Sequence, residues 1–85
     1  MDYKSLYRKR CYVPQTVPDH RLAFGKRVRE LRTGRDLSQE GFAHHIGLDR
    51  TYISGIERGT RNPTLDVLYK LAEGLDVNIA ELFPQ

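Results

Sequence analysis

The side chains with the clearest chemistry lie in the stretch of residues 50–58, RTYISGIER. If Ile53 and Ile56 turn inward on a helix, the outward side presents Arg50, Thr51, Ser54, Gly55 and Arg58. Arginine can hold a guanine through two hydrogen bonds, and a serine or threonine hydroxyl can contact several bases. The stretch therefore favours recognition of double-stranded DNA, with an ordinary solvated helix face as the alternative interpretation.

The preceding residues predict that this stretch is the second of two short helices joined by a tight turn. Apolar residues at helical spacing form one stripe of Phe42, Ala43 and Ile46 and a second stripe of Ile53 and Ile56. Gly47 separates the stripes, and glycine commonly ends a helix because it reaches positive φ at little cost. Ser38 and Asp49 are expected to cap the starts of the two helices.

The stretch from Gln39 to Arg58 resembles the helix-turn-helix of the phage repressor and Cro family, also called the XRE family. The matching residues are Gln39, Ala43, Gly47, Ile53, Ile56 and Glu57. The segment LDRTYISGIERGTRNPTL is especially similar to the controller proteins of restriction-modification systems. The resemblance covers about residues 22–83 and implies an all-α, five-helix, lambda-repressor-like DNA-binding domain.

The apolar pattern elsewhere predicts three further helices. The first is expected to begin with Asp19 as its cap, or a little later, and to run to about Thr33. Thr64 is expected to cap a helix whose buried stripe is Leu65, Leu68, Leu71, Ala72 and Leu75. A short last helix is expected at about residues 78–83. Residues 19–85 are therefore expected to form the DNA-binding domain.

Residues 1–18 differ in charge from the rest of the chain. They hold Lys4, Arg8, Lys9 and Arg10 against Asp2, whereas residues 19–85 carry equal numbers of basic and acidic groups. The segment is expected to be a flexible basic arm that reaches DNA or a partner, or a leader without a role. Any attraction of the domain to DNA must come from local clustering of its charges.

Base readout is assigned to Arg50, Thr51 and Ser54, with Arg50 as the first choice for a guanine. The residues expected to contact the DNA backbone are Ser38, Gln39, Tyr52, Arg58, Arg61 and Asn62. A plain polar loop is the alternative for the last two of these. Gly55 stands where some members of the resembling family carry a longer base-reading side chain, so DNA deformability is expected to contribute to specificity.

Two further roles come from the resemblance. Family members pair an arginine late in the first helix with a glutamate late in the third, which implies a partly buried ion pair of Arg32 with Glu57; two independent surface charges are the alternative. Resembling proteins dimerise through their last helix, and the residues there are Ile79, Leu82 and Phe83. Core closure is the alternative for these three. A homodimer would read two half-sites about 34–36 Å apart.

Composition restricts the other possibilities. With 85 residues, the chain has room for one small domain. The single cysteine, Cys11, allows no internal disulfide, and no apolar run approaches the ~20 residues of a membrane span, which fits a cytoplasmic protein. His44 and His45 are adjacent and point in different directions on a helix, so no metal site or cofactor is expected.

The leading hypothesis is a homodimeric transcriptional regulator that binds a palindromic operator. A restriction-modification controller, a phage-type repressor and an antitoxin-like autorepressor all fit this hypothesis. A protein–protein interaction module with the same fold is the alternative. An enzyme is not expected, because the sequence pairs no nucleophile with a base and has no phosphate loop.

Overall fold

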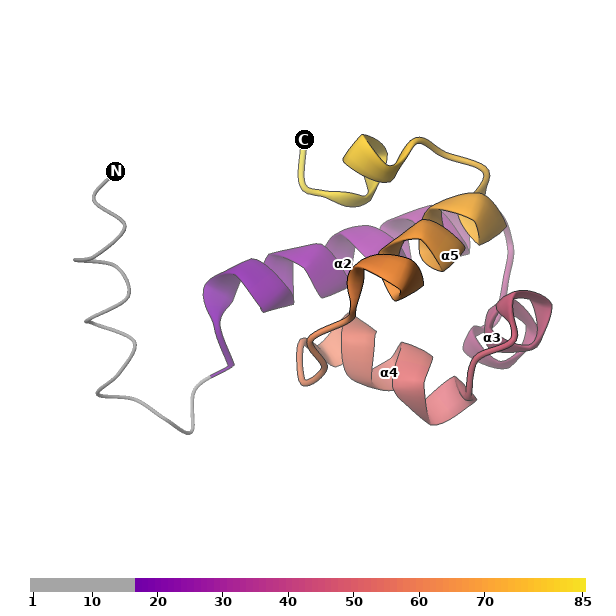
Figure 1. Ribbon diagram of the computed structural model, residues 1–85, viewed down its shortest axis with the longest axis horizontal. Helices are drawn as coiled ribbons and strands as arrows, with labels where there is room; N and C mark the ends of the chain where they lie inside the picture. The colour runs from indigo at the N-terminus through magenta and orange to yellow at the C-terminus, as the bar shows by residue number, and fades with distance from the viewer. Residues whose placement is uncertain (1–16) are drawn as a thin grey trace.

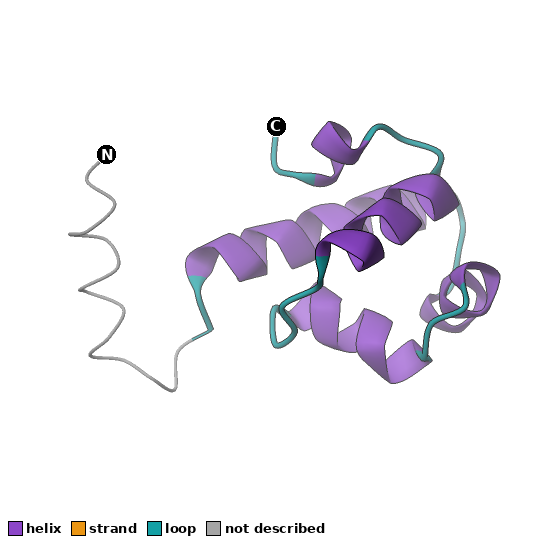
Figure 2. Ribbon diagram, viewed as in Figure 1, coloured by secondary structure: helices purple, strands orange, loops and turns teal. Residues whose placement is uncertain are grey.

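The computed structural model describes residues 17–85, and these form a small all-helical domain (Figures 1 and 2). The elements are α2 (Asp19–Gly34), α3 (Gln39–Ile46), α4 (Arg50–Arg58), α5 (Leu65–Leu75) and η1 (Ile79–Leu82). The predicted all-α class is confirmed. The predicted count of five helices is slightly wrong, because the last element is a single turn of 3₁₀-helix. Most of the predicted basic arm lies outside the described residues.

Local side-chain hydrogen bonds define where three helices begin. The Ser38 Oγ accepts the amide of Gly41 at 2.9 Å, the Asp49 Oδ1 accepts that of Thr51 at 2.9 Å, and the Thr64 Oγ1 accepts that of Val67 at 3.2 Å. All three predicted caps are confirmed. At α2 the prediction is wrong by one residue, because Pro18 occupies the cap position and Asp19 is the first helical residue. A carboxylate is favourable there because it faces the positive end of the helix dipole.

The core draws residues from every helix. Its buried apolar members are Phe24, Val28, Phe42, Ala43, Ile53, Ile56, Leu71, Ala72, Leu75 and Leu82. Leu82 is fully buried within one chain, so its predicted place in a dimer interface is wrong. The side chain belongs to core closure instead, and it brings η1 down onto the domain. The Arg27 Nε also donates to the carbonyl of Glu81 at 2.9 Å, which ties η1 to α2.

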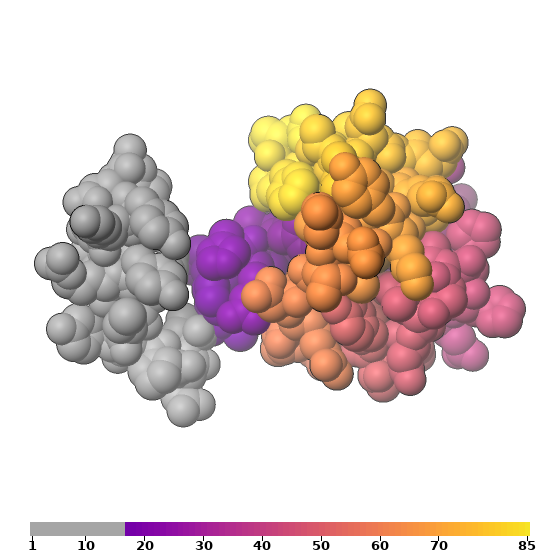
Figure 3. Space-filling view, viewed as in Figure 1, coloured from indigo at the N-terminus to yellow at the C-terminus, as the bar shows by residue number. Residues whose placement is uncertain are grey.

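Helix α2 lies directly against the end of α4. Gly25 is buried at this crossing, and a Cβ built on it would overlap the carbonyl oxygen of Ile56 and lie 2.6 Å from that of Glu57. The two backbones therefore approach more closely than any side chain at residue 25 would allow. This contact supports α4 from its inner side, while the opposite side of α4 lies at one edge of the molecule (Figure 3).

Candidate nucleic-acid interface

Helix α4 turns an apolar side to the core and a polar side to solvent. Ile53 and Ile56 are buried, whereas Arg50, Thr51 and Arg58 are exposed. Arg50 opens the helix and has no hydrogen-bond or ion-pair partner among residues 17–85. Its guanidinium is therefore free to form a two-hydrogen-bond contact with a planar acceptor such as the edge of a guanine.

The two hydroxyl residues assigned to base readout already have partners. The Thr51 Oγ1 donates to the Asp49 carboxylate at 2.8 Å, and the Ser54 Oγ accepts the Arg58 Nη1 at 2.8 Å. Thr51 is exposed, whereas Ser54 is half-buried. With its proton donated to Asp49, the Thr51 hydroxyl acts toward a base as a hydrogen-bond acceptor. The Ser54 O–H and the other N–H groups of Arg58 are not used in this bond and remain available to DNA.

Gly55 does not lie on the exposed side where the sequence placed it. It is buried beneath the side chain of Arg61, whose Cγ would lie 2.6 Å from a Cβ at residue 55. The helical periodicity could not show this, because the covering residue comes from the loop after α4. The prediction that Gly55 belongs to the outward side of α4 is therefore wrong.

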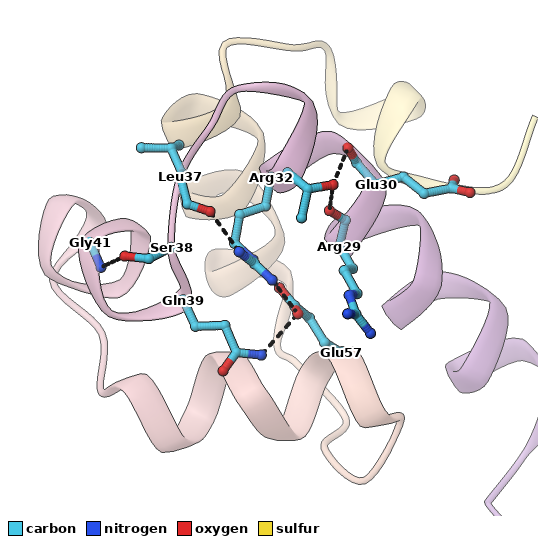
Figure 4. A network of polar contacts seen from close by, with 9 residues as sticks. Arg29, Glu30, Arg32, Leu37, Ser38, Gln39, Gly41 and Glu57 are labelled. Carbon is cyan, nitrogen blue, oxygen red and sulfur yellow. Dashed lines mark hydrogen bonds and ion pairs between the residues drawn. The ribbon is translucent and has the colours of Figure 1, made fainter.

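A buried polar network holds α4 against α2 and the start of α3 (Figure 4). The Arg32 Nε and Nη2 donate to the two carboxylate oxygens of Glu57 at 2.6 and 3.0 Å. The Arg32 Nη1 donates to the carbonyl of Leu37 at 2.6 Å, and the Gln39 Nε2 donates to Glu57 at 3.0 Å. The side chains of Arg32 and Glu57 are only 9% and 3% exposed, so the pair is largely desolvated.

The sequence suggested the Arg32–Glu57 pair but missed the part played by Gln39. Its amide was assigned to a DNA phosphate, yet one of its N–H groups is directed at Glu57. The second N–H of the same amide has no partner among the described residues and can still serve a phosphate. Gln39 thus connects the network to the N-terminus of α3.

The remaining candidates for backbone contact surround α4. The Ser38 hydroxyl is occupied as the cap of α3, and Arg61 and Asn62 are exposed in the loop after α4. The ring of Tyr52 is half-buried, and the guanidinium carbon of Arg61 lies 5.3 Å from its centroid. No sequence signal pointed to this stacking, because it depends on how the loop folds back.

The N-cap of α4 carries a perturbed carboxylate. The amide of Thr51 and then its hydroxyl lower the pKa of Asp49 below its ordinary value, the charge of Arg61 adds to this effect, and desolvation opposes it. Each hydrogen bond to the ionised form stabilises that form. The cap is therefore strongest when Asp49 is ionised.

Substitution of Asp49 by Asn is expected to change the pH dependence of folding. Because the folded pKa is depressed, the contribution of Asp49 is present above its unfolded pKa and is lost as the pH falls through the folded pKa. Asparagine retains the cap, so stability near pH 7 should change little, while the decline below about pH 4 should become shallower. Urea unfolding at pH 7 and pH 3 measures both.

The variant Asp49→Ala is the control, because it removes the cap itself and should lower stability at pH 7 as well. If the stability of Asp49→Asn fell with acid as steeply as that of the unaltered protein, the ionised Asp49 would not be the source of this pH dependence.

Residues 17–85 contain no group of three or more metal-ligating side chains. None of their helices is long and apolar enough to cross a membrane.

The fold and the site define a class of protein. Two short helices are joined by a tight turn at Gly47, and the second is packed on its apolar side and exposes a polar side with an unpaired arginine. This is the geometry of a helix-turn-helix DNA-binding domain. A family model described as "Helix-turn-helix" matches residues 28–82, more than half of the chain, and the chain belongs to this family.

The chain is similar to control proteins of restriction-modification systems. Control protein C.MunI from Mycoplasma sp is 48% identical over 66 residues, which are 76% of this chain and 89% of that protein. The crystal structure of the restriction-modification controller protein C.AhdI from Aeromonas hydrophila is similar at a TM-score of 0.72 and 53% identity, over 73% of this chain and 94% of that one. The controller C.Esp1396I, solved as a tetramer with its natural 35 base-pair operator, matches at a TM-score of 0.67 and 33% identity over 76% and 96% of the two chains.

These comparisons confirm the predicted resemblance to the phage repressor and Cro family and to restriction-modification controllers. The protein is a DNA-binding transcriptional regulator of the helix-turn-helix class.

Proposed function

We propose that this protein acts as a homodimer on a palindromic operator in double-stranded DNA, in the manner of a restriction-modification controller. The observation that carries the proposal is the exposed, unpaired Arg50 at the start of a helix fixed by a buried network. The controller C.Esp1396I was solved as a tetramer in complex with its operator. Its 33% sequence identity with this chain supports double-stranded DNA as the partner here. The protein acts by binding alone, without catalysis or a cofactor, in the cytoplasm where the DNA lies.

In this proposal the N-terminal half of α4 enters the major groove. Arg50 contacts a guanine, and Thr51 and Ser54 contact neighbouring bases. The residues that contact phosphates and sugars are Ser38, Gln39, Tyr52, Arg58, Arg61 and Asn62. These backbone contacts set the register of the helix, and the base contacts provide the sequence preference.

The dimer surface that we propose lies on α5 and the end of the chain. Leu65 and Tyr69 stand four residues apart on one face of α5 and are 64% and 56% exposed, and Phe83 is 43% exposed. Ile79 remains a half-buried neighbour, whereas Leu82 is excluded by its burial. Exposed apolar side chains of this size are typical of an interaction surface.

Replacement of Tyr69 by Glu is expected to weaken the dimer, because it places a charge in the centre of an apolar contact. The concentration at half-association should rise at least about tenfold, measured by sedimentation equilibrium. The control is His44→Glu, which adds the same charge at an exposed position on α3. Equal association constants for the two variants would place the interface elsewhere.

The proposed function is tested by selecting bound sequences from a random pool of double-stranded DNA at two salt concentrations. We expect a palindrome whose half-sites lie one helical turn apart, with affinity falling as salt rises. Recovery of no common sequence, or binding independent of salt, would overturn the proposal in favour of a protein–protein interaction module.

A further inference from the structure

Three residues form a row along one flank of α4. Asp49, Tyr52 and Gly55 follow one another at intervals of three, which places them side by side on a helix. The row ends at Gly55, which has no side chain, and the side chain of Arg61 fills the space above it. A Cβ at Gly55 would lie 2.6 Å from the Cγ of Arg61, closer than packed atoms allow, and 3.3 Å from its Nε.

The backbone after α4 directs Arg61 onto this row. Gly59 ends the helix at φ 81°, a left-handed conformation that favours glycine. The Thr60 amide and hydroxyl then both donate to the carbonyl of Gly55, at 2.9 and 3.2 Å. Because Thr60 is held at the last turn of α4, the side chain of Arg61 begins directly above Gly55.

The charged end of Arg61 reaches Tyr52. The guanidinium carbon lies 5.3 Å from the ring centroid, within the range of a cation–π contact. The ring is a firm support, because Tyr52 is half-buried and packs against the core. Beyond it along the row lies the carboxylate of Asp49, close enough for the charge of Arg61 to act on it. Arg61 thus extends back along α4 toward the half that carries Arg50.

We infer that Gly55 and Tyr52 are positioning residues that hold Arg61 along the flank of α4, so that this arginine meets the DNA as part of the recognition helix and not as a free loop side chain. The inference rests on the proposed function. An arginine has many rotamers to lose on binding, and holding it in one orientation beforehand lowers that cost. Asp49 supplies a countercharge in the free protein, which a DNA phosphate replaces on binding.

A double-mutant cycle on the selected DNA tests the coupling between residues 55 and 61. Gly55→Ala displaces Arg61 and should weaken binding about tenfold and lower the salt slope by about one, as Arg61→Ala does. The double variant should bind no more weakly than either single variant. Additive losses would overturn the inference. The matched control is Gly34→Ala, because a Cβ at the end of α2 meets nothing within 4 Å.

A second measurement needs no DNA. In the NMR spectrum, the side-chain protons of Arg61 should show a ring-current shift from Tyr52 that Tyr52→Phe retains and that Tyr52→Leu and Gly55→Ala abolish. Amide spectra of each variant verify that the domain is folded. Unshifted Arg61 protons in the unaltered protein would overturn the inference. Shifted protons in a protein that binds no DNA would instead overturn the proposed function, and with it the DNA role of Arg61.

Discussion

Replacement of Arg32 by Ala is expected to destabilise the domain by about 3–5 kcal/mol, because it leaves the carboxylate of Glu57 buried without its cation. The two side chains are joined by a pair of hydrogen bonds at 2.6 and 3.0 Å, and the Glu57 side chain is 3% exposed. Gln39 alone cannot compensate, since it donates a single neutral hydrogen bond. The loss is a large fraction of the ~5–15 kcal/mol that stabilises a typical domain.

Urea unfolding of the variant measures this loss. Arg35→Ala is the matched control, because the Arg35–Asp76 pair spans 3.7 Å with side chains 47% and 89% exposed. An exposed pair of this kind contributes at most about 1 kcal/mol. Removing Arg32 and Glu57 together should cost less than the sum of the single losses. If Arg32→Ala behaved like Arg35→Ala, the two residues would be independent surface charges.

Replacement of Arg50 by Ala is expected to reduce affinity for the operator by about 1–3 kcal/mol, which is about five- to about 160-fold, and to relax the preference at one base pair. The side chain is exposed and has no partner among the described residues, so the stability of the domain should be unchanged. This combination separates a base contact from a structural one. Arg50→Lys should restore only part of the loss, because an ammonium group lacks the two-pronged geometry.

Titration of each variant against the selected operator and against single-base variants of it measures both effects. Arg35→Ala is the control, since it removes an equal charge from an exposed arginine that pairs with Asp76 at the far end of α5. Uniform weakening across all the sequences would make Arg50 a phosphate contact. Unchanged affinity together with an unchanged preferred site would remove it from the interface.

The network and the interface are linked through Glu57. This residue lies near the end of α4, and its partners come from α2 and from the start of α3. These hydrogen bonds fix the orientation of α4 relative to α2 and α3. A recognition helix needs a constant orientation, because its side chains must meet the bases in one register.

Features that depend on neighbouring residues were readable from the sequence. Ser38, Asp49 and Thr64 begin their helices as predicted, because a cap bonds to an amide only two or three residues away. The buried residues of α4 and three of those predicted for α5, Leu71, Ala72 and Leu75, follow from helical periodicity, since one side of a short helix must face the core. The prediction that Leu65 belongs to this buried stripe is wrong, because the first residue of α5 is 64% exposed. The family resemblance rests on the same local pattern and was confirmed.

Only the tertiary structure decided which surfaces remain open. Leu82 is apolar and was therefore a candidate for the dimer interface. However, α2 and α5 pack around η1 and place Leu82 in the core. Gly55 lies on the polar side of its helix by spacing, yet a loop residue six positions later covers it. Gln39 likewise meets Glu57 from another helix. Burial is set by segments distant in the chain, so periodicity within one helix determined its inner side but not what covers its outer side.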